Sequence, residues 1–183
     1  GRIRIAATNL EIGVTTWIDG TIEEEGRITV DARLLGEFVN TLPPGTVSMS
    51  VDPSRFQLKV QSGRDKADIN GIDAEDFPVL PTIGGDGFSV ELDAQRFREA
   101  INLVEFAAAT DESRPILAGV LTRFDGDTLM LASSDGFRMA VNESPLDQLV
   151  AERVDIIVPA RAYRELSRII GDFDEPIHLA VTP

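Results

Sequence analysis

The sequence predicts an α+β fold built from short antiparallel strands and a few helices, and three observations carry this prediction. Many short segments alternate apolar and polar residues and are separated by turn residues, which is typical of strands joined as hairpins. Three other segments have the apolar spacing of helices. The starts of these helical segments lie 62 and then 66 residues apart, which predicts a repeated strand-helix-strand unit.

The expected strands follow the alternating segments along the chain. They cover residues 2–6, 28–30, 47–51, 56–60, 88–92, 120–124, 128–131 and 177–181. Turn residues separate them at Pro43-Pro44-Gly45, Asp52-Pro53, Ser62-Gly63 and Asp125-Gly126-Asp127. Because the chain starts and stops inside such alternating segments, we expect it to be a piece of a larger fold.

The three expected helices each begin directly after a strand. Their starts read Asp31-Ala32-Arg33, Asp93-Ala94-Gln95 and Pro159-Ala160-Arg161, and Asp is a good N-cap while Pro suits a first helical turn. In the second helix one apolar stripe is expected to pack on a sheet, and its members are Phe97, Ala100, Ile101, Val104 and Ala108.

The third helix is predicted to have a basic face. At about 100° per residue, Arg161, Arg164 and Arg168 fall on one side. The opposite, apolar side is expected to carry Tyr163, Leu166, Ile169 and Ile170. Such a face suits contact with phosphates. The alternative is an ordinary solvated face in which Arg161 pairs with Glu165.

Two similarities within the chain indicate an internal duplication. The segment Val30–Phe38 resembles Val158–Leu166, 128 residues later, and Ala7-Thr8-Asn9 resembles Ser133-Ser134-Asp135, 126 residues later. Chance similarity of small residues is the alternative. Pro and Gly crowd between residues 78 and 87, so the sequence predicts two related domains, residues 1–83 and 84–183.

Composition excludes several kinds of protein. With no Cys and one His, the chain has no disulfide and no thiolate site and lacks the ligands of most His-based metal sites. No phosphate-binding loop or catalytic triad is recognisable, so we expect neither an enzyme nor a bound cofactor. No apolar run is long enough to span a membrane, and we expect a cytoplasmic protein. The net charge of −14 argues against nucleic acid unless the basic residues gather on one surface.

Residues Leu129–Val141 predict a strand, a turn at Ser134-Asp135-Gly136 and a second strand. Phe137, Arg138 and Met139 follow in succession, and strand alternation cannot turn all three inward. At least one apolar side chain is therefore expected to be exposed beside a cation. An apolar pocket edged by arginine would suit a short peptide, whereas the alternative is a plain hairpin.

These segments resemble one family, the bacterial DNA polymerase III beta subunit, or sliding clamp. The resemblance rests on Ala7-Thr8-Asn9-Leu10-Glu11-Ile12, Val30-Asp31-Ala32-Arg33, Glu75-Asp76-Phe77-Pro78, Arg114-Pro115-Ile116-Leu117-Ala118-Gly119-Val120 and Ser134-Asp135-Gly136-Phe137-Arg138-Met139-Ala140. It implies the DNA-clamp fold, with antiparallel sheets outside and helices on the channel side. It also implies that residues 1–83 are the later part of clamp domain one and residues 84–183 most of domain two.

The resemblance further implies a processivity factor that encircles double-stranded DNA as a homodimeric ring. Basic channel positions match Arg33, Arg98, Arg161 and Arg168, and Arg164 is a weaker match because the family does not require a cation there. The cleft that docks replicative polymerase, clamp loader and repair proteins through short peptides matches Leu117, Ser134, Gly136, Arg138 and Met139, with Phe137 beside them. Ser134 and Met139 replace the usual Thr and Leu. Domain three builds the other wall of that cleft, so only half of it is expected here.

Two other functions compete with this one. A protein-interaction scaffold of the same repeated fold would keep the peptide surface without binding DNA. An enzyme that uses clustered carboxylates would need a divalent metal ion.

Overall fold

The computed structural model describes residues 1–81, 87–111 and 113–182. Contacts divide the chain into two compact units, Gly1–Pro81 and Thr82–Pro183, and each is described by itself. The domain boundary expected after Ile83 lies outside the described residues.

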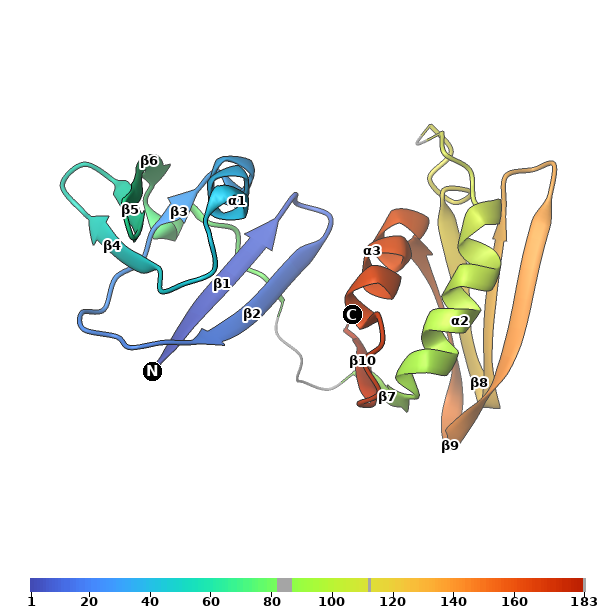
Figure 1. The fold of residues 1–183 in the computed structure, drawn as a ribbon. Coiled ribbons are helices and arrows are strands. Elements are labelled where there is room, and N and C mark those ends of the chain that lie inside the picture. Colours follow the sequence, from blue (N-terminus) through green and yellow to red (C-terminus); the bar gives the residue numbers. More distant parts are fainter. Residues whose placement is uncertain (82–86, 112, 183) are drawn as a thin grey trace. The chain divides into compact units, whose positions relative to one another are not determined.

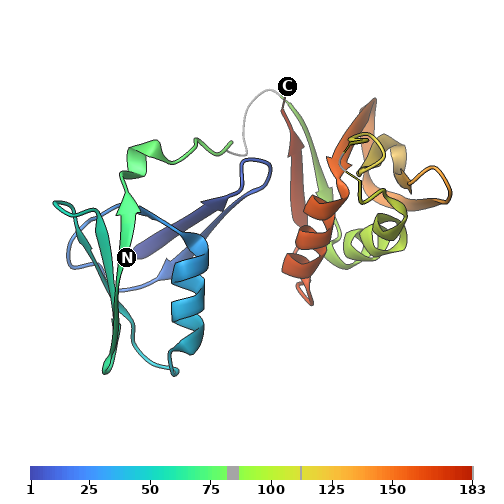
Figure 2. The same cartoon turned by 90° about the horizontal axis from the view of Figure 1, so that it is seen from above.

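The first unit combines a separate hairpin with a helix-covered sheet (Figure 1). Strands β1 (Arg2–Thr8) and β2 (Gly13–Asp19) form the hairpin, and the sheet has the order β3-β6-β5-β4. Its strands are β3 (Thr29–Val30), β4 (Ser48–Asp52), β5 (Gln57–Ser62) and β6 (Asp65–Ile72). Helix α1 (Ala32–Thr41) lies against this sheet (Figure 2), and a short 3-10 turn η1 (Ala74–Asp76) follows β6.

The core of the first unit is small. Leu58, Val60 and Ile69 are its buried members, and Leu35 and Phe38 of α1 pack against them. The hairpin β1–β2 also has an apolar face, because Ile3 lies opposite Ile18 and Ala7 opposite Val14. The described residues leave much of that face uncovered: Ile5, Val14 and Ile18 are 40%, 44% and 41% exposed.

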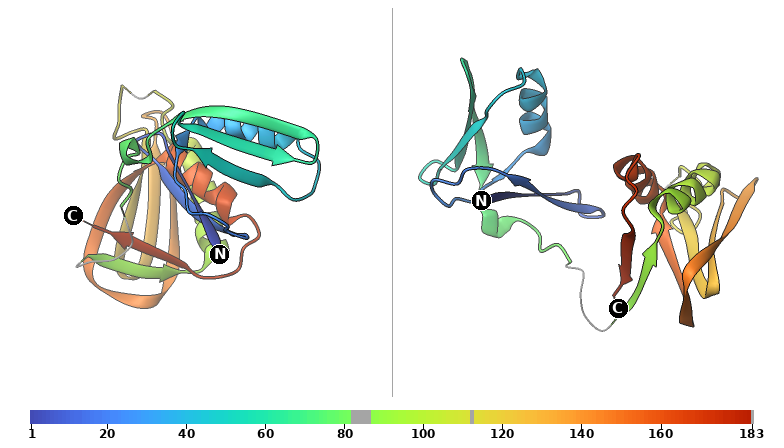
Figure 3. Two further views of the ribbon diagram at one scale, coloured as in Figure 1. Left: turned by 90° about the vertical axis from the view of Figure 1, so that its left-hand side faces the viewer. Right: turned by 60° about the horizontal axis from the view of Figure 1, so that its bottom comes forward.

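In the second unit two helices pack against two antiparallel pairs of strands (Figures 1 and 3). Its elements are β7 (Phe88–Leu92), α2 (Ala94–Val104), η2 (Glu105–Ala107), β8 (Gly119–Ser134), β9 (Met139–Pro159), α3 (Ala160–Ile170) and β10 (Ile177–Val181). β8 pairs antiparallel with β9, and β7 pairs antiparallel with β10. Among the described residues, sixteen buried ones from α2, α3, β7, β8, β9 and the segment after η2 form a single core, and Ile177 and Leu179 of β10 pack against it.

Strand β8 folds back on itself near its middle. Fully extended, its residues would span roughly 50 Å, yet its two ends lie close together. The backbone carbonyl of Arg114 accepts a hydrogen bond from the N–H of Ala118, just before β8. The side-chain Nη1 of the same Arg114 lies 3.8 Å from where a Cβ on Gly136, just after β8, would be. The register against β9 shifts on both sides of Gly126, whose φ is 58°. A turn at residues 125–127 was expected, and the glycine supplies the positive φ that this reversal needs.

The fold-back explains why both halves of β8 face the same core. Thr122 and Phe124 are buried in the first half, whereas Leu129, Leu131 and Ser133 are buried in the second. These buried residues therefore have even numbers before Gly126 and odd numbers after it. A continuous strand would have turned one of these sets outward.

The α+β prediction and the three helix starts are confirmed. Asp31 and Asp93 cap α1 and α2 by accepting hydrogen bonds from the backbone N–H of Leu34 and Arg96, and α3 begins after Pro159. Phe97, Ala100, Ile101 and Val104 of the expected stripe are buried on α2. Ala108 is also buried but lies beyond α2, just after η2, so the helix is shorter than expected. One assignment on α3 is wrong, because Ile169 is 63% exposed. It lies at the border of the apolar face, beyond the reach of the core.

Candidate functional site

The turn between β8 and β9 is held by its own side chains. Ser134 Oγ donates to the carbonyl oxygen of Arg138 at 2.8 Å and accepts from the Gly136 N–H at 3.1 Å. Asp135 Oδ1 accepts from the N–H groups of Phe137 and Arg138, both at 2.9 Å. These backbone hydrogen bonds stabilise the charged carboxylate and hold the pKa of Asp135 below its usual value. Gly136 has φ 93°, which favours glycine.

The turn between β1 and β2 has the same hydrogen bonds, 126 residues earlier. Thr8 Oγ1 donates to the Ile12 carbonyl at 2.9 Å and accepts from the Leu10 N–H at 3.0 Å. Asn9 Oδ1 accepts from Glu11 and Ile12, at 3.1 and 2.9 Å. Leu10 takes the place of Gly136 and also has a positive φ, 74°. This agreement supports the duplication predicted from the sequence.

Arg138 connects the β8–β9 turn to η2, which directly follows α2. Its Nε donates to Asp135 Oδ2 at 3.0 Å and its Nη2 donates to the carbonyl oxygen of Phe106 at 2.9 Å. The guanidinium also lies 5.8 Å from the centre of the Phe106 ring, a cation–π distance. Beside it, Ser133 donates to the carbonyl oxygen of Val104. The turn is thus anchored on the helix that precedes it by about 30 residues.

The loop before β8 completes this surface. The carbonyl oxygen of Leu117 accepts from the Ala109 N–H at 2.8 Å, which fixes the loop to the chain just after η2. Arg114, from the same loop, reaches Gly136, and a side chain in place of that glycine would meet the guanidinium. Leu117 is half-buried. The structure therefore brings the loop of Leu117 and the residues Ser134, Gly136 and Arg138 into one region of the second unit.

Exposed apolar side chains lie on the same turn, on the loop before β8 and on η2. Phe106, Ile116, Phe137 and Met139 are 54%, 73%, 96% and 73% exposed. The expectation that at least one apolar neighbour of Arg138 is exposed is confirmed, and both are. Phe106, Ile116 and Arg114 were not among the predicted site residues. Phe106 gave no local signal, because its contact with Arg138 spans 32 residues.

The predicted basic positions all lie on helices, and Arg33, Arg98, Arg164 and Arg168 each lie beside a carboxylate. Arg33 Nε lies 2.8 Å from Glu37 on α1, and Arg168 Nη1 lies 3.0 Å from Glu165 on α3. Arg164 bonds to Glu105, and Arg98 Nη1 lies 3.7 Å from Asp172. Arg161 is half-buried on α3. Arg98, Arg161, Arg164 and Arg168 share the second unit, whereas Arg33 belongs to the first.

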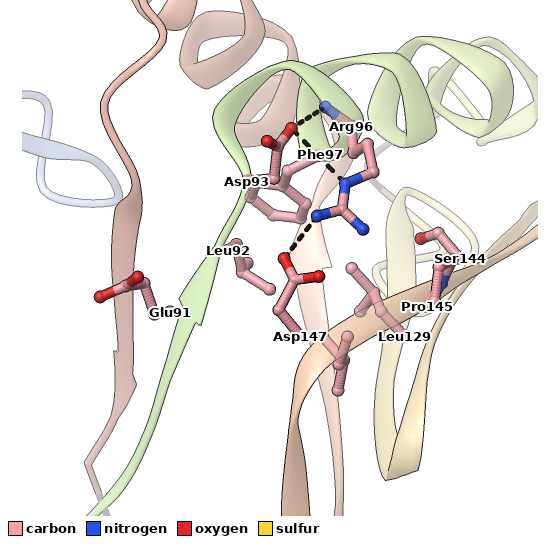
Figure 4. Close-up of a pocket in the computed structure, with 10 residues that line it drawn as sticks. Glu91, Leu92, Asp93, Arg96, Phe97, Leu129, Ser144, Pro145 and Asp147 are labelled. Carbon is pink, nitrogen blue, oxygen red and sulfur yellow. Dashed lines mark hydrogen bonds and ion pairs between the residues drawn. The ribbon is translucent and has the colours of Figure 1, made fainter.

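The cavity drawn in Figure 4 lies elsewhere in the second unit. It is bordered by the start of α2 and by β8 and β9, and Arg96 reaches across it from Asp93 to Asp147. Its volume is about 10 Å³, room for about one water molecule. The predicted site residues do not line it. We assign no function to this cavity.

Two further observations concern the described residues alone. They contain no group of three or more His, Cys, Asp or Glu side chains arranged to hold a metal ion. No helix among them has the length and apolar character that crossing a membrane requires.

Comparison with known families matches both units. Residues 1–81 match the family described as DNA polymerase III beta subunit, N-terminal domain, and residues 91–183 match DNA polymerase III beta subunit, central domain. Among curated proteins, the chain is 33% identical to the beta sliding clamp of Synechocystis over 185 residues, covering 92% of this chain and 47% of that protein. The chain thus spans about half the length of the curated relatives it matches.

Solved structures agree with these matches. The chain resembles the crystal structure of the DNA polymerase sliding clamp from Bacillus subtilis with a TM-score of 0.89 and 28% identity, over 98% of this chain and 49% of that one. It resembles the DNA polymerase sliding clamp from Caulobacter crescentus with a TM-score of 0.88 and 29% identity, over 100% of this chain and 50% of that one. The likeness confirms the clamp fold expected from the sequence.

Proposed function

The chain belongs to the DNA polymerase III beta subunit family, and on this premise we propose that it is part of a sliding clamp that keeps a DNA polymerase on duplex DNA. In this proposal residues 1–83 are the later part of clamp domain one and residues 84–183 most of domain two. The full ring is a homodimer in the cytoplasm, and its role is mechanical, without catalysis.

The observation that carries the proposal is the surface around Arg138. A guanidinium held by Asp135 and Phe106 lies on an anchored turn beside the exposed side chains of Phe106, Phe137 and Met139. Fixed geometry lowers the entropy cost of binding, and exposed apolar groups beside a cation suit a short peptide with an apolar anchor and an acidic or carbonyl group. We propose that Leu117, Ser134, Gly136, Arg138 and Met139, with Phe137 beside them, receive peptide motifs of the polymerase, the clamp loader and repair proteins.

The DNA-facing part of the proposal rests on the helices. We propose that Arg33, Arg98, Arg161 and Arg168 contact phosphates of duplex DNA without regard to sequence, and that Arg164 lies on the same DNA-facing surface. The helical surface formed by α2 and α3 carries four of these arginines, although the chain as a whole has a net charge of −14. Contacts of this kind are weak individually and permit sliding.

Peptide binding tests the partner surface directly. Heteronuclear NMR of the 183-residue chain, titrated with clamp-binding peptides, should shift the amide signals of residues 134–139 and of the loop around Leu117. Arg138→Ala should weaken the shifts several-fold, because it removes the anchor of the turn. Arg123→Ala is the matched control, because Arg123 pairs with Asp155 and does not belong to the proposed peptide surface. Equal shifts in both variants would contradict the assignment.

Retention on circular DNA tests the clamp as a whole. A chimera in which residues 1–183 replace the aligned half of the Synechocystis beta sliding clamp should be loaded onto nicked circular DNA and stay bound, then dissociate once the circle is cut. Polymerase extension on a primed circle should lengthen in parallel. A folded, dimeric chimera that binds the polymerase peptide but is never retained on circles would favour the interaction scaffold instead.

A further inference from the structure

Helices α2 and α3 are joined side by side by polar contacts along their length. Gln95 of α2 donates to the carbonyl oxygens of Gly171 and Phe173, just after α3, at 3.2 and 2.7 Å. Farther along, Ser167 Oγ donates to Asn102 Oδ1 at 2.8 Å. Arg164 and Glu105 form the last contact of this series. The arginines of α3 therefore lie on a pair of helices that are held together by side-chain hydrogen bonds.

The Arg164–Glu105 contact is tighter than an ordinary surface ion pair. Arg164 Nε and Nη2 both donate to Glu105 Oε2, at 3.1 and 2.7 Å. The Glu105 side chain is only 19% exposed, whereas Arg164 is 55% exposed. The hydrogen bonds and the charge of Glu105 raise the pKa of Arg164 above its usual value. The carboxylate is thus a half-buried partner that occupies the donors of an accessible guanidinium.

The other pairs of this helical surface are looser. Arg168 and Glu165 are neighbours on one helix and are 73% and 49% exposed, and Arg98 lies 3.7 Å from a fully exposed Asp172. Exposed pairs of this kind contribute little and open readily. Glu105 differs because its carboxylate is largely shielded from water.

We infer that Glu105 occupies Arg164 in place of a DNA phosphate and so limits how strongly this helical surface holds duplex DNA. The inference rests on the proposed function, since it assumes that α2 and α3 face the duplex. A phosphate that takes the Nε and Nη2 donors of Arg164 must displace the carboxylate and leave Glu105 half-buried without its cation. That cost offsets the new contact, so Arg164 adds little to affinity while Glu105 is charged.

A pair of neutralising variants tests this. Glu105→Gln removes the competing charge at nearly constant shape, and fluorescence anisotropy of a labelled duplex should show affinity higher by about three- to tenfold at low salt. The plot of log K against log salt should steepen by about 0.9, the value for one further phosphate contact. Adding Arg164→Ala to Glu105→Gln should abolish both changes, whereas Arg164→Ala alone should alter binding less than twofold.

Asp155→Asn is the matched control. Asp155 binds Arg123 and Arg153, with contacts between 2.6 and 3.1 Å, on the sheet face away from the helices. The substitution Asp155→Asn removes one negative charge, as Glu105→Gln does, and releases two arginines, but we expect no gain in DNA affinity. Equal gains in the two variants, or no gain in Glu105→Gln, would overturn the inference.

A separate variant distinguishes this failure from failure of the proposed function. Arg161→Ala/Arg168→Ala in the unaltered background should weaken duplex binding if α3 faces DNA. Weaker binding there without a gain in Glu105→Gln rejects the role of Glu105 and leaves the clamp proposal standing. If duplex binding is unchanged both in Arg161→Ala/Arg168→Ala and in Glu105→Gln, the DNA-facing assignment of α3 is rejected together with the inference.

Discussion

Tyr163 shows how one residue reports on the packing of α3 against β8. It is 2% exposed, its ring meets Phe97 edge to face, and its hydroxyl lies 2.6 Å from Thr122 Oγ1. Burial disfavours the phenolate and raises the pKa of Tyr163 to about 12, although the hydrogen bond with Thr122 opposes the shift. Because the chain has one tyrosine, its ionisation can be followed without interference.

We therefore predict a pH dependence at high pH. The folded pKa lies above the ordinary value of 10.0, so the stability linked to Tyr163 is complete below pH 10 and is lost as pH rises towards 12. The ultraviolet absorbance of tyrosinate should appear near pH 12, or together with unfolding. Tyr163→Phe should remove this part of the pH dependence. Absorbance that rises around pH 10 in the folded protein would contradict the burial of Tyr163.

Asp135 and Asn9 form a natural comparison, because each accepts two backbone hydrogen bonds in equivalent turns. Asp135→Asn should preserve the turn, as Asn9 does, whereas Asp135→Ala should disorder residues 134–139.

The pKa of Asp135 is lowered, so its contribution to the stability of the turn is present above the ordinary carboxyl pKa of 3.8 and is lost as pH falls below it. Amide NMR shifts of Phe137 and Arg138 measure both effects. A turn that keeps its shifts in Asp135→Ala would be held by Ser134 instead.

At the scale of elements, the N-caps set where helices begin. Asp93 Oδ1 accepts from the Arg96 N–H at 2.8 Å, at the point where β7 passes into α2. Asp93→Ala should lower the free energy of unfolding of the second unit by about 1 kcal/mol. Asp93→Asn keeps the acceptor and should cost much less, which urea denaturation can resolve. Equal losses in the two variants would mean that charge, through Arg96, matters more than the cap.

The helices and turns were predictable because their signals are local. Asp31, Asp93 and Pro159 mark helix starts within one turn of the chain, and Gly126 and Gly136 mark reversals by needing positive φ. Contacts between distant segments left no such signal. Arg164 meets Glu105 across 59 residues, so the basic face of α3 was predicted without the carboxylate that occupies it.

The duplication was predictable in part. Thr8-Asn9 and Ser134-Asp135 are chemically alike, and their hydrogen bonds agree. The two copies differ in what packs on the strand that precedes each turn. Leu129 and Leu131 are buried beneath α2, whereas the equivalent Ile3 and Ile5 lie on a face that the described residues leave partly exposed. Alternation predicts which residues share a face, but not what packs on it.

At the scale of the whole chain, the two units have unequal cores. Among the described residues, the second unit buries sixteen in one cluster, while the first buries Leu58, Val60 and Ile69. Stability increases with the apolar surface removed from water, so the first unit should unfold at a lower temperature than the second. Differential scanning calorimetry should therefore show two transitions.

Two matched substitutions assign the transitions. Leu58 and Leu131 are 7% and 0% exposed, and replacing either with Ala should cost about 2 to 5 kcal/mol in its own unit. For a unit of this size each kcal/mol lowers Tm by about 4 to 8 °C. Leu58→Ala should then shift the lower transition alone, and Leu131→Ala the upper one alone. If either substitution moved both transitions equally, the two units would unfold as one cooperative body, and the prediction of separate transitions would be wrong.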